Sequence, residues 1–384
     1  MNTASLEDNL RLVRGGPEFF DCLREMIDNA EEELHLQTFI FADDSTGRPV
    51  LNALKAAAQR GVRVLVLVDG YGGALPAGVL EELRQAGVEA RLFAPWLSWS
   101  SLHFGRRLHH KVVVADKRIL LIGGINIANK YHGTAEAQAW LDFAVRFESP
   151  RIGREVAALC DRIYQRRHGI QRRSRIWDSC AMSGDVVTVL QNDWLLRKNQ
   201  IYRSYLKNLA HARNEIIIVG TYFLPGRRLT RVLRQVGSKQ VRVRLILAGM
   251  SDVKILRRAT AYLYRSLLGN GVELFEWPHS VLHGKAAVAD GRWATVGSFN
   301  LNQLSAYGSI EMNAEVISDQ FGKTATNAFE EVIAQCNPVT LESLNLRENW
   351  RERLLNWASY QIMRISLQML TFTSYRRIWT AVKG

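Results

Sequence analysis

The chain has 384 residues, enough for two domains of ordinary size, and 47% of them are hydrophobic, as in a globular protein. The formal net charge of +13 favours an anionic partner, either nucleic acid or an acidic membrane surface, although solubility alone is a third explanation. The four cysteines are far apart in the sequence, which argues against a zinc site or a disulfide framework and fits a reducing cytosol. No apolar run reaches the roughly 18 to 20 residues that a membrane-spanning helix needs, and residues 1–16 contain no apolar signal core.

The first half of the chain alternates predicted helices with predicted strands. Apolar side chains recur at helical spacing in residues 18–32, and a helix over 49–60 ends at Gly61. The β-branched run 62–68 is typical of a strand that is buried on both faces. The remaining elements predicted here are strand 34–41, helix 77–86, strand 88–93, strand 139–147 and helix 151–165. This alternation predicts a layered α/β domain over residues 8–165.

Segment 95–108 interrupts the alternation. It brings Trp96 and Trp99 together with two arginines shortly before His109. One interpretation is a loop folded onto the core. The other is a lipid-facing edge of a site, since tryptophan and arginine favour membrane interfaces.

The second half repeats the plan of the first. A basic linker is predicted over 166–184, because residues 165–177 contain five arginines and no acid. In the second half, 185–337, a helix precedes a strand in the same way as at the start of the chain. The elements predicted there are helix 199–213, strand 214–220, helix 226–236, strand 241–247, helix 252–268, strand 272–276, strand 310–317 and helix 320–335. The repeat predicts two similar domains, each a mixed β-sheet flanked by helices, related by a pseudo-two-fold axis.

A polar pattern, H-x-K-x4-D-x6-G-[SG]-x-N, begins at His109 and again at His283, so that every position of the pattern recurs at one constant offset. His-x-Lys on a strand places both side chains on one face. A return strand and a glycine turn then bring an asparagine beside them. Each copy therefore builds half of a phosphate site. The two copies facing each other would build a whole site at the interface of the domains.

This doubled motif resembles the signature of the phospholipase D superfamily, and the resemblance covers residues 8–335. Within the superfamily the chain is most similar to the bacterial cardiolipin synthases of the short B type, which lack transmembrane helices. The stretches that carry this closer similarity are 33–41, 59–71, 221–226 and 293–301. The first copy departs from the family at Gly124, where many members have serine.

The resemblance implies a transfer reaction in two steps through a covalent phosphohistidine. It implies His109 as the nucleophile and His283 as general acid and then general base; the motif residues alone are symmetric and do not choose between them. No metal or other cofactor is implied. His110, which immediately follows His109, satisfies no spacing and is predicted to be structural or solvent-facing.

The other motif residues are implied to hold the phosphate or to support the site. Five side chains would hold the non-bridging oxygens, namely Lys111, Lys285, Asn126, Ser298 and Asn300. Asp116 and Asp290 belong to the catalytic motif of the family, but they close their strands and are expected to be structural.

An imidazole that attacks phosphorus needs an acceptor on its other nitrogen, which fixes the tautomer. Asp142 follows His109 at nearly the same interval as Glu315 follows His283, and each acid lies on the next predicted strand. Because they occupy nearly the same position of the repeat, we predict that they are the orienting carboxylates.

The tail, 338–384, differs in composition from the rest. From residue 345 onward it carries seven basic and two acidic residues among apolar ones. A terminal helix packed on the core is one interpretation. The favoured one is a basic amphipathic helix in the headgroup region of a membrane. The residues predicted to face lipid are Trp96, Trp99, Trp350 and Trp357.

The resemblance implies phosphatidyl transfer from a donor phospholipid to phosphatidylglycerol, which gives cardiolipin and releases the headgroup alcohol. The substrates would be phospholipids, namely phosphatidylglycerol and, as a second candidate, phosphatidylethanolamine, and the sequence does not select the donor. The protein would bind the anionic surface of the bacterial inner membrane from the cytoplasmic side. Nucleic acid is not expected as a partner. Two alternatives stay open, namely hydrolysis of phospholipids, in which water replaces the acceptor alcohol, and a nuclease that uses the basic surface.

Overall fold

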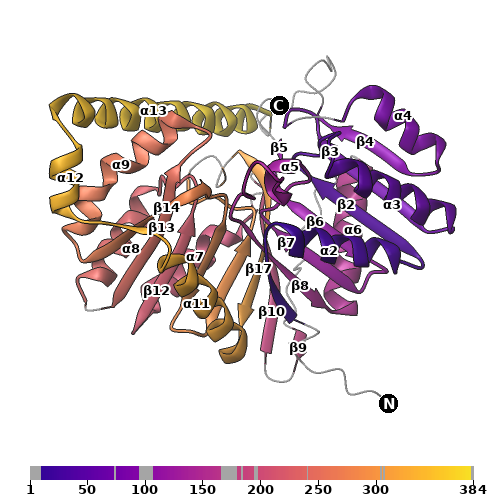
Figure 1. The fold of residues 1–384 in the computed structure, drawn as a ribbon, viewed down its shortest axis with the longest axis horizontal. Coiled ribbons are helices and arrows are strands. Elements are labelled where there is room, and N and C mark those ends of the chain that lie inside the picture. Colours follow the sequence, from indigo (N-terminus) through magenta and orange to yellow (C-terminus); the bar gives the residue numbers. More distant parts are fainter. Residues whose placement is uncertain are drawn as a thin grey trace.

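The computed structural model describes residues 10–72, 75–94, 107–165, 180–182, 185–193, 198–239, 241–302, 305 and 308–381, with the backbone alone for 180–182, 198 and 367–381. These residues form two β-sheets, one from each half of the chain, with helices on their outer faces (Figure 1). The segment with Trp96 and Trp99 lies outside the described residues, as does most of the predicted linker.

The first sheet has seven strands in the order β1, β8, β7, β6, β2, β3, β4. Strands β2, β3 and β4 are parallel, and β6, β7, β8 and β1 each pair antiparallel with their neighbours. Their bounds are β1 (Leu10–Arg14), β2 (Glu33–Thr38), β3 (Arg63–Asp69), β4 (Glu89–Phe93), β6 (Lys111–Ala115), β7 (Ile119–Gly123) and β8 (Phe143–Glu148). The helices of this half are α2 (Pro17–Asp28), α3 (Gly47–Gln59), α4 (Ala77–Gln85), α5 (Asn129–His132) and α6 (Pro150–Tyr164).

The second sheet follows the order β11, β10, β17, β16, β15, β12, β13, β14, β18, and the short strands β5 and β9 pair with β17 and β10. The bounds of its longer strands are β10 (Asp185–Asp193), β12 (Glu215–Gly220), β13 (Arg242–Met250), β14 (Val272–Val281), β15 (Lys285–Ala289), β16 (Trp293–Gly297) and β17 (Ser309–Ile317). The short ones are β5 (Arg107–Leu108), β9 (Cys180–Met182), β11 (Lys198–Asn199) and β18 (Asn337–Val339). The helices are α7 (Gln200–His211), α8 (Arg227–Gly237), α9 (Lys254–Leu268), α11 (Asp319–Ile333), α12 (Leu341–Arg347) and α13 (Trp350–Ala381).

The predicted duplication is confirmed by the topology. Strands β1, β8, β7, β6, β2, β3 and β4 of the first sheet correspond in order to β10, β17, β16, β15, β12, β13 and β14 of the second. The repeat extends to helix caps, since Ser149 accepts a hydrogen bond from the third residue of α6 and Ser318 does the same in α11. It also extends to Gly153 and Gly322, where a Cβ would lie 2.1 Å from a carbonyl oxygen of the turn after each motif strand.

Two differences from the sequence analysis concern the strands beside the motifs. Strands β1 and β10 were not predicted, although they occupy equivalent edges of the two sheets. The strand predicted over 139–147 begins only at Phe143, because Leu141 before it forms a single bridge with Leu282 of the second half.

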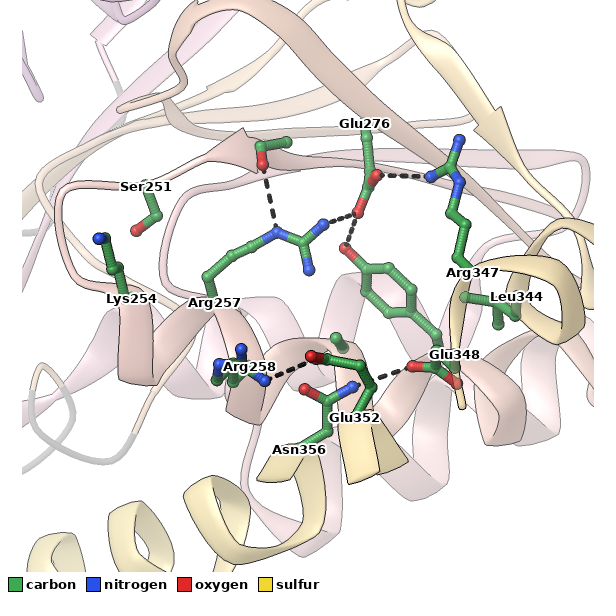
Figure 2. A pocket seen from close by; sticks show the side chains of 13 residues that line it. Ser251, Lys254, Arg257, Arg258, Glu276, Leu344, Arg347, Glu348, Glu352 and Asn356 are labelled. Atoms are coloured by element: carbon green, nitrogen blue, oxygen red, sulfur yellow. Dashed lines mark hydrogen bonds and ion pairs between the residues drawn. The ribbon is translucent and has the colours of Figure 1, made fainter. Parts of the chain in front are cut away.

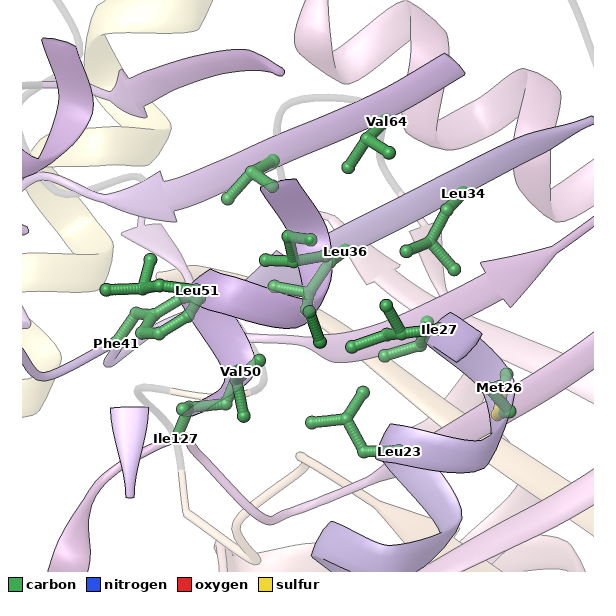
Figure 3. Packing of buried hydrophobic residues seen from close by; sticks show 14 of the residues in the cluster. Leu23, Met26, Ile27, Leu34, Leu36, Phe41, Val50, Leu51, Val64 and Ile127 are labelled. Carbon is green, nitrogen blue, oxygen red and sulfur yellow. The ribbon is translucent and has the colours of Figure 1, made fainter. Parts of the chain in front are cut away.

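Apolar clusters hold these layers together. In the first half, α2 and α3 pack on one face of β2 and β3 through side chains such as Leu23, Ile27, Leu36 and Leu51 (Figure 3). A matching cluster lies between the second sheet and α7, α8 and α9. The central cluster combines strand residues of both sheets with residues of α6 and α11, so the inner faces of the two halves share one core. This shared core fixes the two motif strands relative to each other.

Candidate active site

Each half of the chain holds the backbone of the other half's motif histidine. Strand β5, which immediately precedes His109, pairs with β17 of the second half, and the amide of His109 donates to the carbonyl of Ile310 at 3.0 Å. Reciprocally, Leu141 of the first half forms a bridge with Leu282, and the amide of His283 donates to the carbonyl of Leu141 at 2.7 Å. The site is therefore built at the boundary of the halves, as the sequence predicted.

Each imidazole contacts a carboxylate from the opposite half. Nδ1 of His109 lies 2.9 Å from Oε2 of Glu311, and Nδ1 of His283 lies 2.6 Å from Oδ2 of Asp142. Both carboxylates are completely buried. An ionised carboxylate only accepts, so the contact with Glu311 requires a hydrogen on Nδ1 of His109 and leaves Nε2 as its reactive nitrogen. Nδ1 of His283 also lies 2.9 Å from Nζ of Lys285, so Asp142 and Lys285 both contact this nitrogen.

The prediction of Glu315 as an orienting carboxylate is wrong. Its carboxylate accepts hydrogen bonds from Ser204 of α7 and from Nε1 of Trp293 of β16 instead. The equivalent of Asp142 is Glu311, because the connection from the motif asparagine to the next strand is shorter in the second half than in the first. Asp142 does contact a motif imidazole, but that of His283 rather than that of His109.

The two carboxylates have different surroundings. Glu311 also accepts from Ser298 Oγ at 2.5 Å and from Ser309 Oγ at 2.7 Å, and although burial opposes ionisation, its contact with His109 lowers the pKa of the carboxyl. Asp142 accepts a backbone hydrogen bond from Phe143 at 2.8 Å, and burial raises its pKa to about 7 in spite of the nearby Lys285. The first half thus supplies the carboxyl that binds a proton more readily.

Gly124 explains part of this difference. A Cβ at this position would lie 2.4 Å from Oδ1 of Asp142, closer than non-bonded atoms approach. In the second half, Ser298 occupies the equivalent position and donates to Glu311. In the first half, the carboxylate of Asp142 fills the space that a serine side chain would need, so Gly124 is required by the position of Asp142.

Both motif lysines are buried beside the histidines. Lys111 and Lys285 expose 4% and 2% of their surface, and each ammonium donates to the carbonyl of the histidine two residues earlier. Burial is the main reason that the pKa of Lys111 falls to about 7 and that of Lys285 to about 8. The charge of Lys285 contributes to the lowered pKa of Lys111. Two buried ammonium groups this close favour an anion between them.

Burial also lowers the pKa of both imidazoles. For His109 the charges of the two lysines add to this, and Glu311 opposes it. For His283 the lysines add again, and the pKa falls well below its ordinary value. Both rings are therefore neutral at neutral pH, which is the state a nitrogen nucleophile needs.

The predicted phosphate-binding amides and hydroxyl are buried and largely engaged with the protein. Asn126 donates to the hydroxyl of Tyr131 at 2.7 Å and accepts from the amide of Ile40 at 3.0 Å, and Ser298 donates to Glu311. In the described part of the chain, Oδ1 of Asn300 is buried without a hydrogen-bond partner. Direct contact of these groups with a phosphate stays a prediction.

Asp116 and Asp290, included as positions of the family motif and expected to be structural, make contacts with the backbone of a neighbouring strand. Both have the left-handed conformation, with φ of 50° and 52°, and lie at the opposite end of the motif strand, about 16 Å from its lysine. Each carboxylate accepts from backbone amides that begin the neighbouring strand, residues 31–33 for Asp116 and 213–215 for Asp290.

His110, the histidine next to His109, is buried, and its Nε2 lies 2.8 Å from Oε1 of Gln37. Its structural role agrees with the prediction, whereas a solvent-facing position was wrong.

Aromatic side chains that the sequence analysis missed surround His283. The rings of Tyr131 and Trp140 lie 5.2 and 5.7 Å from the imidazole, and the Tyr131 hydroxyl lies 3.5 Å from Nε2. Tyr222 lies at 6.4 Å and donates its hydroxyl to Asp252. The only signal available was the position of Tyr131 shortly after Asn126, and the second copy has a serine at the equivalent place.

Asp69, at the end of β3, is a further buried carboxylate beside the site. It accepts from the amide of Leu108 at 2.8 Å and from that of Tyr71 at 2.8 Å, and Nη1 of Arg107 lies 3.8 Å away. Burial raises its pKa, and these hydrogen bonds oppose the shift. Because Leu108 immediately precedes His109, Asp69 holds the strand that presents the first imidazole.

A pocket of about 400 Å³ lies elsewhere, between α9, the end of β13 and helices α12 and α13 (Figure 2). Its arginines are paired with acids: Arg257 with Glu276 at 2.6 Å, Arg258 with Glu352 at 2.8 Å, and Arg347 with Glu276 at 3.4 Å. These pairs attach the tail helices to the second half, and the motif histidines do not line the pocket. In the described part of the chain, no three His, Cys, Asp or Glu side chains gather as metal ligands would.

Two mixed α/β halves, each with one His-x-Lys motif whose histidine contacts a carboxylate of the other half, define a phospholipase D-like protein. A family model described as "Cardiolipin synthase, PLD-like domain" matches residues 23–163 and 205–333. The chain is 35% identical over 360 residues to cardiolipin synthase B of Escherichia coli strain K12, covering 89% of this chain and 85% of that protein. It is 26% identical over 354 residues to minor cardiolipin synthase ClsB of Bacillus subtilis strain 168, covering 91% and 87%. The chain therefore belongs to the cardiolipin synthase family of phospholipase D-like proteins.

A solved structure supports the fold. The crystal structure of phosphatidylserine synthase from Haemophilus influenzae Rd KW20 matches with a TM-score of 0.74 over 95% of this chain and 96% of that one, at 15% identity. At that identity the likeness shows the fold alone.

Proposed function

We propose that the chain is a cardiolipin synthase, which transfers a phosphatidyl group from a donor phospholipid to phosphatidylglycerol. The observation that carries the proposal is the pair of imidazole–carboxylate contacts made across the halves, His109 with Glu311 and His283 with Asp142, beside two buried lysines. Membership of the family supports the choice of substrates.

In the first step, Nε2 of neutral His109 attacks the phosphorus of the donor. The bond from phosphorus to the headgroup oxygen breaks, and His283 gives that oxygen a proton, so that the headgroup leaves as an alcohol. The empty site favours neutral His283 because the lysines repel a further positive charge. An anionic phosphodiester offsets the lysine charges, which favours the protonated ring that this step needs.

In the second step, neutral His283 takes the proton from a hydroxyl of phosphatidylglycerol, and the hydroxyl oxygen attacks the phosphorus. The bond from phosphorus to His109 breaks, and cardiolipin forms. One phosphodiester is broken and one is made, so the exchange requires no nucleotide. Lys111 and Lys285 hold the non-bridging oxygens in both steps.

The surroundings of the two histidines support this order of roles. Glu311 has a lowered pKa and three donors, so it holds His109 in one orientation. Asp142 has a raised pKa of about 7, so the Asp142–His283 pair is the one suited to gain and lose a proton.

The same proposal places the protein on the cytoplasmic side of a bacterial inner membrane, as a peripheral protein with domains over 8–165 and 185–337. In the described residues, no helix combines the length and the apolar composition that crossing a membrane requires.

The test is to incubate the protein with labelled phosphatidylglycerol in excess EDTA and without nucleotide, and to separate the products. Cardiolipin with an equal amount of free glycerol is the expected result. Phosphatidic acid as the main product would replace the transferase with a hydrolase. No lipid product, together with cleavage of single-stranded or double-stranded DNA, would replace it with a nuclease.

A further inference from the structure

Helix α13 exposes a face that is rich in large apolar side chains, with Gln361 and Arg351 among them. Trp350, Leu354, Trp357 and Ile365 recur at helical spacing and are 69%, 52%, 47% and 48% exposed. Leu355 and Ile362, on the adjoining row, are also about half exposed. A face of this size on a surface helix marks a contact with another apolar phase or partner.

The opposite face of α13 is attached to the second half. Asn356 and Ser359 are buried, Tyr360 and Met363 pack on the outer core, and the rings of Tyr262 and Tyr360 lie 4.7 Å apart. The helix thus packs a mixed polar and apolar side on the second half, and the described residues do not cover its apolar outer side. Packing on the core and an exposed apolar face, which the sequence presented as alternatives, occur on the same helix.

Ion pairs fix this attachment (Figure 2). Glu352 of α13 pairs with Arg258 of α9 at 2.8 Å, and Glu348, just before the helix, pairs with Arg265 at 3.2 Å. Asn356 donates to Glu348 at 2.9 Å. The helix is therefore an integral part of the second half, so that whatever binds its outer face also orients the catalytic halves.

The charge around the apolar face is positive. The two acids at its start are occupied by the pairs with Arg258 and Arg265, whereas Arg351 and Arg353 are exposed on the helix. The guanidinium of Arg351 lies 5.4 Å from the centre of the Trp350 ring. Apolar side chains flanked by arginine and tryptophan match the headgroup region of an anionic bilayer.

We propose that the outer face of α13 lies in the headgroup region of an anionic phospholipid bilayer and sets the orientation of the protein on it. This membrane contact rests on the proposed function in one respect, which is that the lipid substrates lie in a bilayer. A second copy of the chain fits this face less well, because a contact between two such faces brings the exposed Arg351 and Arg353 of both copies into one interface. Figure 1 shows the helix along the upper edge of the second half, ending near the boundary with the first half and in the same part of the view as β5 and α5.

The test uses the full chain and vesicles, without turnover. Leu354→Asp with Trp357→Asp should weaken co-sedimentation with vesicles of phosphatidylglycerol and phosphatidylcholine at least tenfold, while thermal unfolding stays within a few degrees of the parent. Lys323→Asp on α11, at the opposite edge of the molecule in Figure 1, makes the same change in net charge and should bind as the parent does. Arg351→Gln with Arg353→Gln should reduce binding to these vesicles and leave the weak binding to pure phosphatidylcholine unchanged.

Three results would overturn the proposal. The first is equal vesicle binding by the parent and the Leu354→Asp, Trp357→Asp variant. The second is a parent that sediments as a dimer, becomes a monomer on the same change and keeps its vesicle binding, which would assign the face to a second copy. The third applies if the double variant shows no folding transition. In that case a milder Trp350→Ser variant is measured, and vesicle binding equal to that of the parent would overturn the proposal. Failure of the proposed function is measured separately, as absence of cardiolipin from detergent-dispersed lipid with the unaltered chain.

Discussion

The carboxylate of Glu311 lies 2.9 Å from Nδ1 of His109, although 202 residues of chain separate the two. The reciprocal contact joins His283 to Asp142 over 141 residues. Each motif histidine therefore takes its carboxylate from the other half. The active arrangement exists only when the two sheets share their common core.

The first prediction compares two glutamates on the same strand. Glu311→Gln should lower kcat by roughly 10²- to 10⁴-fold, because an amide no longer holds Nδ1–H of His109 and can select the wrong tautomer. Glu315→Gln is the matched control, since Glu315 bonds Ser204 and Trp293 instead, and it should change stability more than kcat. Steady-state rates on detergent-dispersed phosphatidylglycerol measure both. Equal losses in the two variants would count against the pairing of Glu311 with His109.

The second prediction concerns Gly124. Gly124→Ser should lower the rate, even though serine is the residue at the equivalent position of the second half. Its Cβ would displace the carboxylate of Asp142, which is fixed by His283 and the amide of Phe143. Gly78→Ser is the control, because a Cβ there meets nothing within 4 Å. A Gly124→Ser protein as active as the parent would show that Asp142 has room to adjust.

The duplicated fold could be predicted from the sequence, because hydrophobic periodicity and the spacing from His109 to Asn126 are local properties of the chain. The partner of His109 could not. Looking for an acid at nearly the same interval after His283 as Asp142 has after His109 gave Glu315, since nothing in the sequence shows that the second half has a shorter loop before β17. That each carboxylate belongs to the histidine of the other half follows only from the packing of the sheets.

Residues outside the repeat were missed for a similar reason. Asp69 and Tyr131 have no counterpart of the same type in the second half, so comparison of the two copies did not select them. The packed and the exposed sides of α13 could not be separated either, because nothing local in the sequence shows which side meets α9.

The third prediction concerns pH. The value of kcat/KM should decline as pH rises through about 7 to 8, because Lys111 and Lys285 lose the charges that bind phosphate in the free enzyme. It should also decline on the acid side, below the ordinary pKa of 6.5, as His109 becomes protonated and loses its nucleophilic lone pair. Rates measured between pH 5 and pH 9 on detergent-dispersed lipid give both limbs. A value that keeps rising to pH 9 would exclude charged lysines as phosphate ligands.

The fourth prediction concerns Asp69, which we assign as a positioning residue. Asp69→Asn should lower kcat about tenfold or more with little change in KM, because the amide of Leu108 loses a charged acceptor and the adjoining imidazole is less well placed. Asp161→Asn, which removes a carboxylate paired with Arg63 in the same half, is the control. If KM rises and kcat stays constant, Asp69 acts on lipid binding instead.

The most direct test of the account is the site of the covalent intermediate. The protein is quenched in alkali, under which phosphohistidine survives, during turnover of labelled phosphatidylglycerol, and the peptides are mapped by mass spectrometry. The account predicts an acid-labile phosphatidyl adduct on His109, increased in His283→Ala when the donor has a good leaving group and absent in His109→Ala. An adduct on His283, or label in neither histidine while cardiolipin still forms, would contradict it.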